Sequence, residues 1–418
     1  MMATMSPVTR RIAIALLMAS LVLRLVAWWV VPSPHLSTNA ITDYLGGAQL
    51  LTEGDGFRDP SYPLITPPLY ALCIAASWQI FGKTQTPIIL SQILIDSVTT
   101  VVVYIIVLAI FGEVAGVICG ALLAIYPFLI YPTLYIGPES YFTFLFALFV
   151  FLMIHALRQN DWRYFGAAGL VLGAATMMRG TTQFLPFFLM LVSPIFMRGQ
   201  RRFIFGFLVL ALTFSLALLP WTIRNKIVLD SIIPVASAGA LVFLWGSSQN
   251  FLEIDQRAKD FPTFLEWLSQ EGINQPPRGS SPAEKERFIF RAGIESYKRQ
   301  FETDPAGAIR FLFIKVIRLS YSTESGNNHG LILGVNAGIY AFAIVGILLA
   351  WQRNIQPHWF FLAIFAYFII LHWVTLPLFR YMVPIMPYVI AYASYAAAVL
   401  YERCLVVRPQ HLGAMKGE

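Results

Sequence analysis

The sequence contains few charged residues. Asp, Glu, Lys and Arg make up 12% of its 418 residues, whereas hydrophobic residues make up 57%. A soluble globular domain usually carries about 25% charged residues, so this composition excludes a soluble globule. The apolar residues are grouped in long runs, which predicts an all-α polytopic membrane protein.

Cysteine and histidine are also scarce, with three and six residues. Cys73, Cys119 and Cys404 lie in or beside apolar segments, without the spacing of a metal site or of a disulfide framework. The histidines likewise lack ligand spacing. No internal repeat or low-complexity tract is present. The sequence therefore indicates no metal site, and we expect no cofactor.

The formal net charge is +7. A basic excess can indicate a nucleic-acid partner, but here Lys and Arg form short clusters beside the apolar runs, as cytoplasmic loops do. We therefore expect no nucleic-acid partner and place these clusters on the cytoplasmic side. They comprise Arg10 and Arg11, residues 158–163, residues 198–202, Arg353 and residues 403–408.

Counting apolar runs between these clusters predicts about ten transmembrane helices, with both termini in the cytoplasm. Residues 12–31 are interpreted as a retained first span and not a cleaved signal peptide. Residues 68–81 are apolar but short, so we interpret them as a re-entrant or interfacial helix begun by proline. The predicted spans are residues 12–31, 86–111, 114–131, 141–157, 164–178, 182–196, 203–219, 331–351, 359–374 and 381–400.

This topology divides the chain into three parts. Residues 1–219 form an N-terminal transmembrane catalytic module that includes a first outer loop at residues 33–85. Residues 220–329 form an extracytoplasmic helical region with juxtamembrane helices, in which residues 308–322 have the pattern of an interfacial amphipathic helix. Residues 330–418 form the C-terminal transmembrane helices and a cytoplasmic tail.

The first outer loop is the long polar interval that comes after the first span. A carboxylate held beside the bilayer can accept a proton from an acceptor hydroxyl, and a nearby cation can hold a phosphate leaving group. Asp43 and Arg58 are the candidates in this loop. Because Asp43 lies at the head of a short helix predicted over residues 41–51, capping of that helix is an equally good explanation.

The same topology places further ionisable residues on the outer side. These residues were not used to define the topology, which rests on the Lys and Arg clusters of the cytoplasmic side. Ionisable groups at membrane depth are costly and usually mark a functional or paired site. A charge at a helix start and interfacial anchoring are the simpler explanations, although Arg380 departs from the positive-inside tendency. The residues are Lys83, Glu139, Arg179, Arg224, His372 and Arg380.

Several short motifs occur together in a familiar order. They are TPPLY before residue 71, FG at the end of the short helix that it begins, Pro127 and Glu139, MMRG, LLPWTIRN and FRYMVPIMPY. In this order they resemble the polyprenyl-phosphate-dependent glycosyltransferases of the GT-C superfamily, in particular the branch of aminoarabinose transferases and protein O-mannosyltransferases. The resemblance covers roughly residues 10–400 and is strongest before residue 250.

The resemblance implies a GT-C fold and an inverting transfer of a sugar from a polyprenyl phosphate donor to an extracytoplasmic glycan, lipid or protein acceptor. It also implies an integral location in a bacterial-type inner membrane. Asp43 matches the catalytic base and Glu139 the second acidic residue. Arg179, Arg224 and Arg380 match cationic positions of the family. The residues that we expect to bind substrate are Tyr44, Arg58, Tyr70, Arg179, Arg224, Arg380 and Tyr381. The relatives that transfer aminoarabinose have lysine where this chain has Thr66, so another cation must serve.

Two other classes of function are compatible with a polytopic protein. A lipid or sugar transporter would be expected to have charged sites near mid-membrane and inverted repeats. The predicted spans are nearly free of charge, with Asp96 as the main exception. A noncatalytic assembly subunit of the same fold is the other alternative, and the presence of both Asp43 and Glu139 argues against it.

Overall fold

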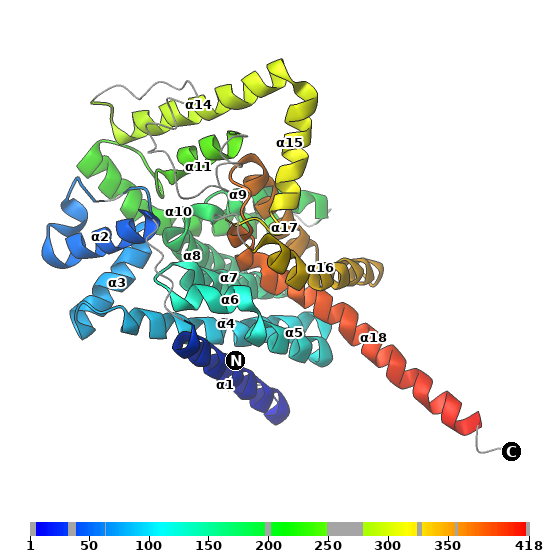
Figure 1. The fold of residues 1–418 in the computed structure, drawn as a ribbon. Helices are drawn as coiled ribbons and strands as arrows, with labels where there is room; N and C mark the ends of the chain where they lie inside the picture. The colour runs from blue at the N-terminus through cyan, green and yellow to red at the C-terminus, as the bar shows by residue number, and fades with distance from the viewer. Residues whose placement is uncertain are drawn as a thin grey trace.

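The structure is a computed structural model that describes residues 6–31, 39–62, 64–196, 202–248, 279–323, 328–355 and 358–414. Every regular element in these ranges is a helix (Figure 1), which confirms the all-α prediction. The elements are α1 (Pro7–Val30), α2 (Asn39–Glu53), η2 (Gly56–Arg58), α3 (Pro68–Phe81), α4 (Thr86–Phe111), α5 (Glu113–Ile125), α6 (Pro127–Ile130), η3 (Tyr131–Leu134), α7 (Glu139–Gln159), α8 (Trp162–Met178), η4 (Gly180–Thr182), α9 (Leu185–Phe196), α10 (Arg202–Leu229), α11 (Ala238–Ser247), α14 (Pro282–Thr303), α15 (Pro305–Arg318), α16 (His329–Gln352), α17 (His358–Val374), η6 (Phe379–Tyr381), η7 (Val383–Ile385) and α18 (Met386–Ala414).

Six of the described helices are long and apolar enough to cross a membrane, and a seventh span results if α5 and the bent segment after it count as one. The predicted count of about ten is not confirmed. Three of the predicted spans correspond to helices that are shorter than a bilayer crossing. These are α8, α9 and α17, with 17, 12 and 17 residues. A straight crossing needs about 20 residues, so length alone does not identify these three as spans.

The two helices of the first loop differ in how well the sequence predicted them. The predicted bounds of α3 are confirmed, because Pro68 occupies the first turn and Gly82, with a φ of 79°, ends the helix. Helix α2 instead begins at Asn39, four residues before Asp43. Asp43 therefore lies in the second turn and does not cap the helix.

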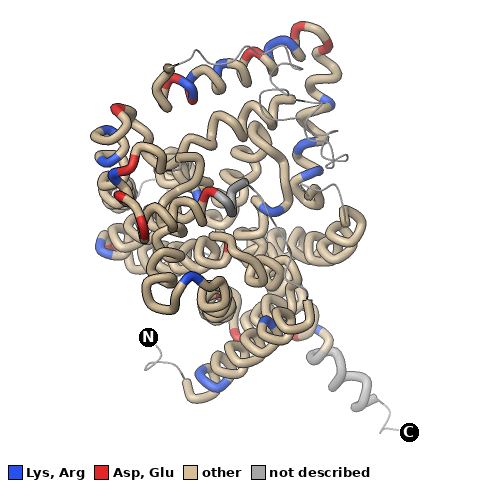
Figure 2. Tube along the Cα trace, turned by 60° about the vertical axis from the view of Figure 1, so that its left-hand side comes forward, with Lys and Arg blue, Asp and Glu red and all other residues tan. Residues whose placement is uncertain are grey.

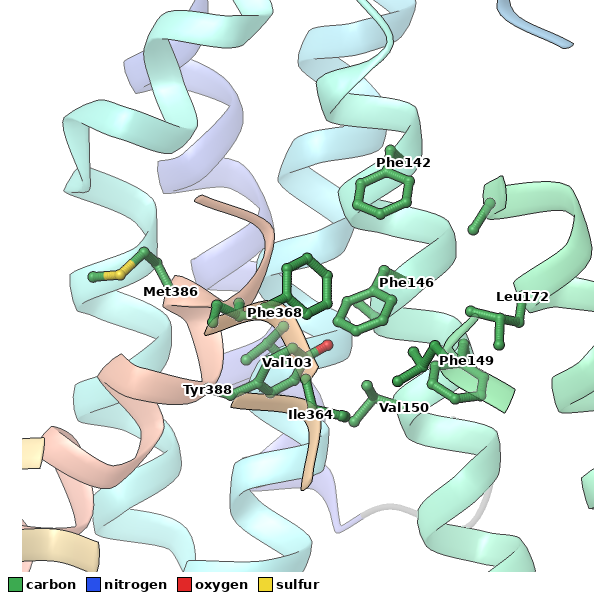
Figure 3. Packing of buried hydrophobic residues seen from close by; sticks show 14 of the residues in the cluster. Val103, Phe142, Phe146, Phe149, Val150, Leu172, Ile364, Phe368, Met386 and Tyr388 are labelled. Carbon is green, nitrogen blue, oxygen red and sulfur yellow. The ribbon is translucent and has the colours of Figure 1, made fainter. Parts of the chain in front are cut away.

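Helix α7 runs through the centre of the apolar core. Phe142, Phe146 and Phe149 recur at helical spacing on one face and are fully buried. Figure 3 shows Phe146 facing Phe368 of α17 and Tyr388 of α18, with ring centroids 5.6 and 6.1 Å away. This packing fixes α7, and with it the position of Glu139 at its first residue.

A buried ion pair joins the first span to the core. The Arg24 guanidinium of α1 bonds Asp96 Oδ2 of α4 through Nε at 2.6 Å, and the two side chains are 0% and 2% exposed. Arg24 Nη1 also donates to the Ala124 carbonyl of α5 at 3.3 Å. Asp96 is thus no lone charge, and Arg24 is the intramembrane residue that the sequence pattern did not single out.

Helices α11, α14 and α15 lie together at one end of the molecule (Figure 1), and we call them the end layer. Charged residues crowd α14 at the top of Figure 2, whereas the helices below it are mostly uncharged. Helix α14 begins with a capping box in which Ser281 and Glu284 bond each other's backbone N–H groups. Part of the predicted region of residues 220–329 falls outside the described residues.

Candidate functional site

Glu139 and Arg179 face each other between α7 and the end of α8. Their closest atoms, Glu139 Oε1 and Arg179 Nη1, are 3.7 Å apart, and their side chains are only 13% and 11% exposed. A Cβ at Gly137 would lie 2.4 Å from Glu139 Oε2, so only glycine lets the carboxylate fold back over the preceding chain. The distance between the charged groups is too long for a hydrogen bond, and the pair is held by charge.

Charged and aromatic side chains of this site pack on the ring of Tyr381, which we call the Tyr381 platform. The guanidinium groups of Arg179 and Arg380 each lie 5.0 Å from its centroid. His372 of α17 stacks on it at 4.6 Å with an interplanar angle of 4°. Two predicted cations from segments far apart in the sequence therefore converge on one aromatic ring, an arrangement that cation–π attraction stabilises.

Tyr44 brings the first loop to the same place. Its hydroxyl donates to the Met178 carbonyl at 3.4 Å. Burial raises the pKa of Tyr44 well above its ordinary value; the charge of Glu139 acts in the same direction and the charges of Arg179 and Arg380 oppose it. Tyr44 is thus within electrostatic reach of all three. Asp43, next to it on α2, is half-buried, and desolvation raises the pKa of its carboxyl group.

The side-chain amide of Gln92 forms hydrogen bonds with two of the elements around the site. Its Oε1 accepts from the Tyr70 hydroxyl of α3 at 2.5 Å, and its Nε2 donates to the Tyr135 carbonyl at 2.7 Å. The Tyr70 ring contacts the ring of Tyr44 edge-on at 5.1 Å. One amide in α4 therefore fixes α3, the segment before Glu139 and, through Tyr70, the start of the first loop.

Arg224 and Arg58 belong to a different part of the first loop. Arg224 of α10 donates to the Phe57 carbonyl at 2.5 Å and to the Asp59 carbonyl at 2.8 Å. Its guanidinium also lies 5.0 Å from the ring of Trp221. Arg58 is exposed on η2. Arg224 therefore holds the first loop in place through the N–H groups of its guanidinium. The contact with a phosphate that the sequence predicted would need these same N–H groups.

The remaining outer cation of the sequence prediction lies on the surface. Lys83 pairs with Glu53 between two side chains that are 50% and 47% exposed. Such an exposed pair contributes little to stability. Among the described residues no three His, Cys, Asp or Glu side chains lie close enough to hold a metal ion.

Three buried polar atoms in this region have no hydrogen-bond partner among the described residues. They are Glu139 Oε2, Arg179 Nη1 and His372 Nε2. Unsatisfied buried polar atoms are costly in a folded protein, so each of them calls for an explanation, and a bound ligand is one. A carboxylate and a guanidinium with unused hydrogen-bonding capacity can serve an acceptor and an anion, respectively.

Two residues of the site were not identified from the sequence in these roles, namely Gln92 and His372, and the burial of Lys315 was not predicted either. Gln92 carried a usable signal, because a polar amide inside an apolar run usually has a specific partner. Lys315 comes one helical turn after Phe311, so it shares that residue's buried face. The sequence pattern groups it with Arg310 on an interfacial helix, but of these two cations only Arg310 is exposed.

Comparison with known proteins supports one fold. A family model described as dolichyl-phosphate-mannose-protein mannosyltransferase matches residues 66–223. The apo oligosaccharyltransferase of Archaeoglobus fulgidus, a GT-C superfamily member, matches 97% of this chain at 15% identity with a TM-score of 0.58. The chain has the GT-C fold. It spans about half of the archaeal enzyme's length, at 52%.

Two further solved structures are similar to this chain. The same archaeal oligosaccharyltransferase, AglB, in complex with an inhibitory peptide and a dolichol-phosphate matches 97% of this chain and 52% of its own, at 13% identity and a TM-score of 0.55. ArnT from Cupriavidus metallidurans matches 91% of this chain and 76% of its own at 16% identity, with a TM-score of 0.40 that is too low to support an argument. The comparison with curated proteins found no match.

Proposed function

We propose that this protein is a membrane glycosyltransferase that transfers a sugar from a polyprenyl phosphate donor to an extracytoplasmic acceptor with inversion. The observation that supports this most is the convergence of Arg179 and Arg380 on the Tyr381 ring, with Glu139 paired to Arg179 and Tyr44 within electrostatic reach of all three, within a GT-C fold. Asp43 is the neighbour of Tyr44 in α2. The AglB structure with a dolichol-phosphate supports a lipid phosphate as the donor's leaving group.

Asp43 is the proposed general base. It accepts the proton of the acceptor hydroxyl or amine as that oxygen or nitrogen attacks the anomeric carbon. The C–O bond to the phosphate breaks on the opposite face of the sugar, so a single displacement inverts the configuration. Desolvation at its half-buried position raises the pKa of its carboxyl group, which makes Asp43 a better proton acceptor than an exposed aspartate.

Arg179 and Arg380 are the proposed phosphate ligands. The leaving polyprenyl phosphate gains negative charge as the sugar departs, and fixed cations stabilise that charge without having to reorganise. Glu139 keeps the Arg179 guanidinium in place from 3.7 Å and takes part in positioning the acceptor. The apolar walls of the spans would hold the polyprenyl chain.

The proposal is tested by incubating the purified protein in detergent with a panel of polyprenyl phosphate sugars and candidate acceptors. Consumption of one donor, with release of polyprenyl phosphate and formation of a product of inverted configuration, is the expected result. A protein that binds none of the donors, or that moves the lipid across a vesicle membrane without cleaving it, would contradict the proposal. The second result would favour the transporter alternative.

Replacing Arg179 with alanine is expected to weaken donor binding by about 1.5 to 3 kcal/mol, on the order of 10- to 100-fold, because a buried charge-assisted contact is lost. Arg380→Ala should act in the same direction. Arg179→Lys should restore only part of the affinity, because lysine lacks the planar group that stacks on Tyr381. Donor affinity is measured by isothermal titration in detergent.

The matched control is Arg163→Ala. Arg163 lies at the opposite end of α8, the helix that leads into Arg179, and it is exposed. Its replacement removes one cation of the same helix but should leave donor affinity unchanged. Wild-type affinity in both Arg179→Ala and Arg380→Ala would reject the two arginines as phosphate ligands.

A further inference from the structure

Lys315 is a fully buried cation on α15. Its Nζ donates to the Gly246 carbonyl of α11 at 2.7 Å and to the Tyr297 hydroxyl of α14 at 2.6 Å. The ammonium group also lies 5.3 Å from the Tyr297 ring and 5.5 Å from the Phe311 ring. Lys315 therefore joins all three helices of the end layer.

The charge of Lys315 has no acidic counterpart among the described residues, since none of their ion pairs includes it. Burial lowers the pKa of its ammonium group to about 7. Keeping a cation in such a place costs folding free energy, which an apolar side chain of similar length would avoid. A structural role at the junction could be served by a neutral hydrogen-bond donor, so the charge needs its own explanation.

The junction around Lys315 leads directly to the segment that carries the site. The Tyr297 hydroxyl donates to the Val374 carbonyl at the end of α17 at 2.9 Å, and Trp373 Nε1 donates to the Leu312 carbonyl of α15 at 2.9 Å. Tyr381 packs with Tyr297 against a small cluster of Phe311, Leu376 and Leu378. Movement of Lys315 would therefore be transmitted to the Tyr381 platform.

The electrostatics point the same way. The imidazole of His372, which stacks on Tyr381, lies within the electrostatic reach of Arg179, Arg380 and Lys315. Glu139 is the acidic residue that pairs with one of these three cations. The charges of three cations therefore act on one ring of the site, and positive charge gathered in this way favours an anion.

We propose that Lys315 is a positioning residue of the candidate site: it fixes the segment that carries Arg380 and Tyr381 against the end layer, and the phosphate of the bound donor balances its buried charge. This inference rests on the proposed function. It assigns to the end-layer helices a part in donor binding that the family comparison, which matches residues 66–223, does not cover.

The test measures binding of the methyl diester of undecaprenyl phosphate to the purified full-length protein in detergent. This probe cannot transfer a sugar, and its phosphodiester keeps one negative charge through the neutral pH range. Lys315→Met, which keeps the length of the side chain but removes the charge, is expected to weaken binding about tenfold or more. Arg310→Met is the matched control on the same helix, because Arg310 is exposed, and it should bind like the wild type.

A pH series separates the charge from the packing. The Tyr297 hydroxyl of α14 is bonded to the Lys315 ammonium group, and the charge of Lys315 reaches His372 of α17, on which Arg179 and Arg380 also act. Because the ammonium is charged below its lowered pKa and neutral above it, wild-type affinity should fall as the pH rises from about 6 to about 8. Lys315→Arg stays charged over this range, so its affinity should change little with pH.

Each outcome decides between the proposals. If the wild type binds the probe and Lys315→Met binds it equally well, this inference is overturned and the proposed function stands. A pH dependence that persists in Lys315→Arg would assign the titration to another group and also overturn it. If the wild type does not bind the probe at all, the proposed function fails and the role of Lys315 fails with it.

Discussion

Asp43→Asn is expected to fold and bind the donor lipid normally while losing turnover by about 10² to 10⁴, the usual contribution of a positioned general base. Asparagine keeps the size of the side chain but cannot accept the acceptor's proton. Initial rates with a polyprenyl phosphate sugar, together with donor titration, measure the two effects separately. The acidic limb of the wild-type pH–rate profile should lie above the ordinary pKa of aspartate, because burial raises the pKa of Asp43.

The position of Asp43 in α2 makes this substitution informative. The helix begins at Asn39, so Asp43 is not available as its N-cap residue, and a capping role would not explain a large effect. A large loss of turnover without loss of stability therefore points to chemistry at this carboxylate.

Glu139→Gln is the control for the assignment of the base. In the proposed mechanism Glu139 orients Arg179 and the acceptor, so the glutamine variant should retain more activity than Asp43→Asn. Its weakened hold on Arg179 should appear partly in donor affinity. Normal turnover in Asp43→Asn with an inactive Glu139→Gln would assign the base to Glu139 at the start of α7.

Asp96→Asn is expected to destabilise the protein by about 3 to 5 kcal/mol, because it leaves the buried Arg24 guanidinium without its counter-charge. The pair joins α1 to α4, and the contact of Arg24 with Ala124 adds α5. Thermal unfolding in detergent, monitored by circular dichroism, measures the effect. Donor affinity of the folded fraction should remain that of the wild type.

Two further variants define the origin of this loss. The double variant Arg24→Met with Asp96→Leu removes both charges and should recover most of the stability, because no unpaired charge remains. Asp230→Asn breaks the exposed pair with Lys226 on the same chain and should leave the melting temperature nearly unchanged. A wild-type melting temperature for Asp96→Asn would show that the pair does not hold the first span.

The sequence by itself determined the features that depend on local composition and periodicity. Apolar runs with few charges predict helices in a membrane, and the bounds of α3 and α4 agree with the predicted residues 68–81 and 86–111. Motif order predicted the GT-C fold. The number of spans was less well determined, because α8, α9 and α17 are shorter than a bilayer crossing and composition does not distinguish a short crossing from a buried or re-entrant helix.

Only the tertiary structure decided which side chains meet. Arg24 and Asp96 lie 72 positions apart, and Arg224 contacts a carbonyl 167 positions away. Helical periodicity indicates which face of a helix is buried, but it carries no information about the neighbour that buries it. The sequence therefore identified Arg179, Arg224 and Arg380 as equivalent cations, whereas packing placed two of them on the Tyr381 ring and used the third to hold the first loop. Packing also brought Lys315 to the site from a helix that composition alone assigned to the membrane surface.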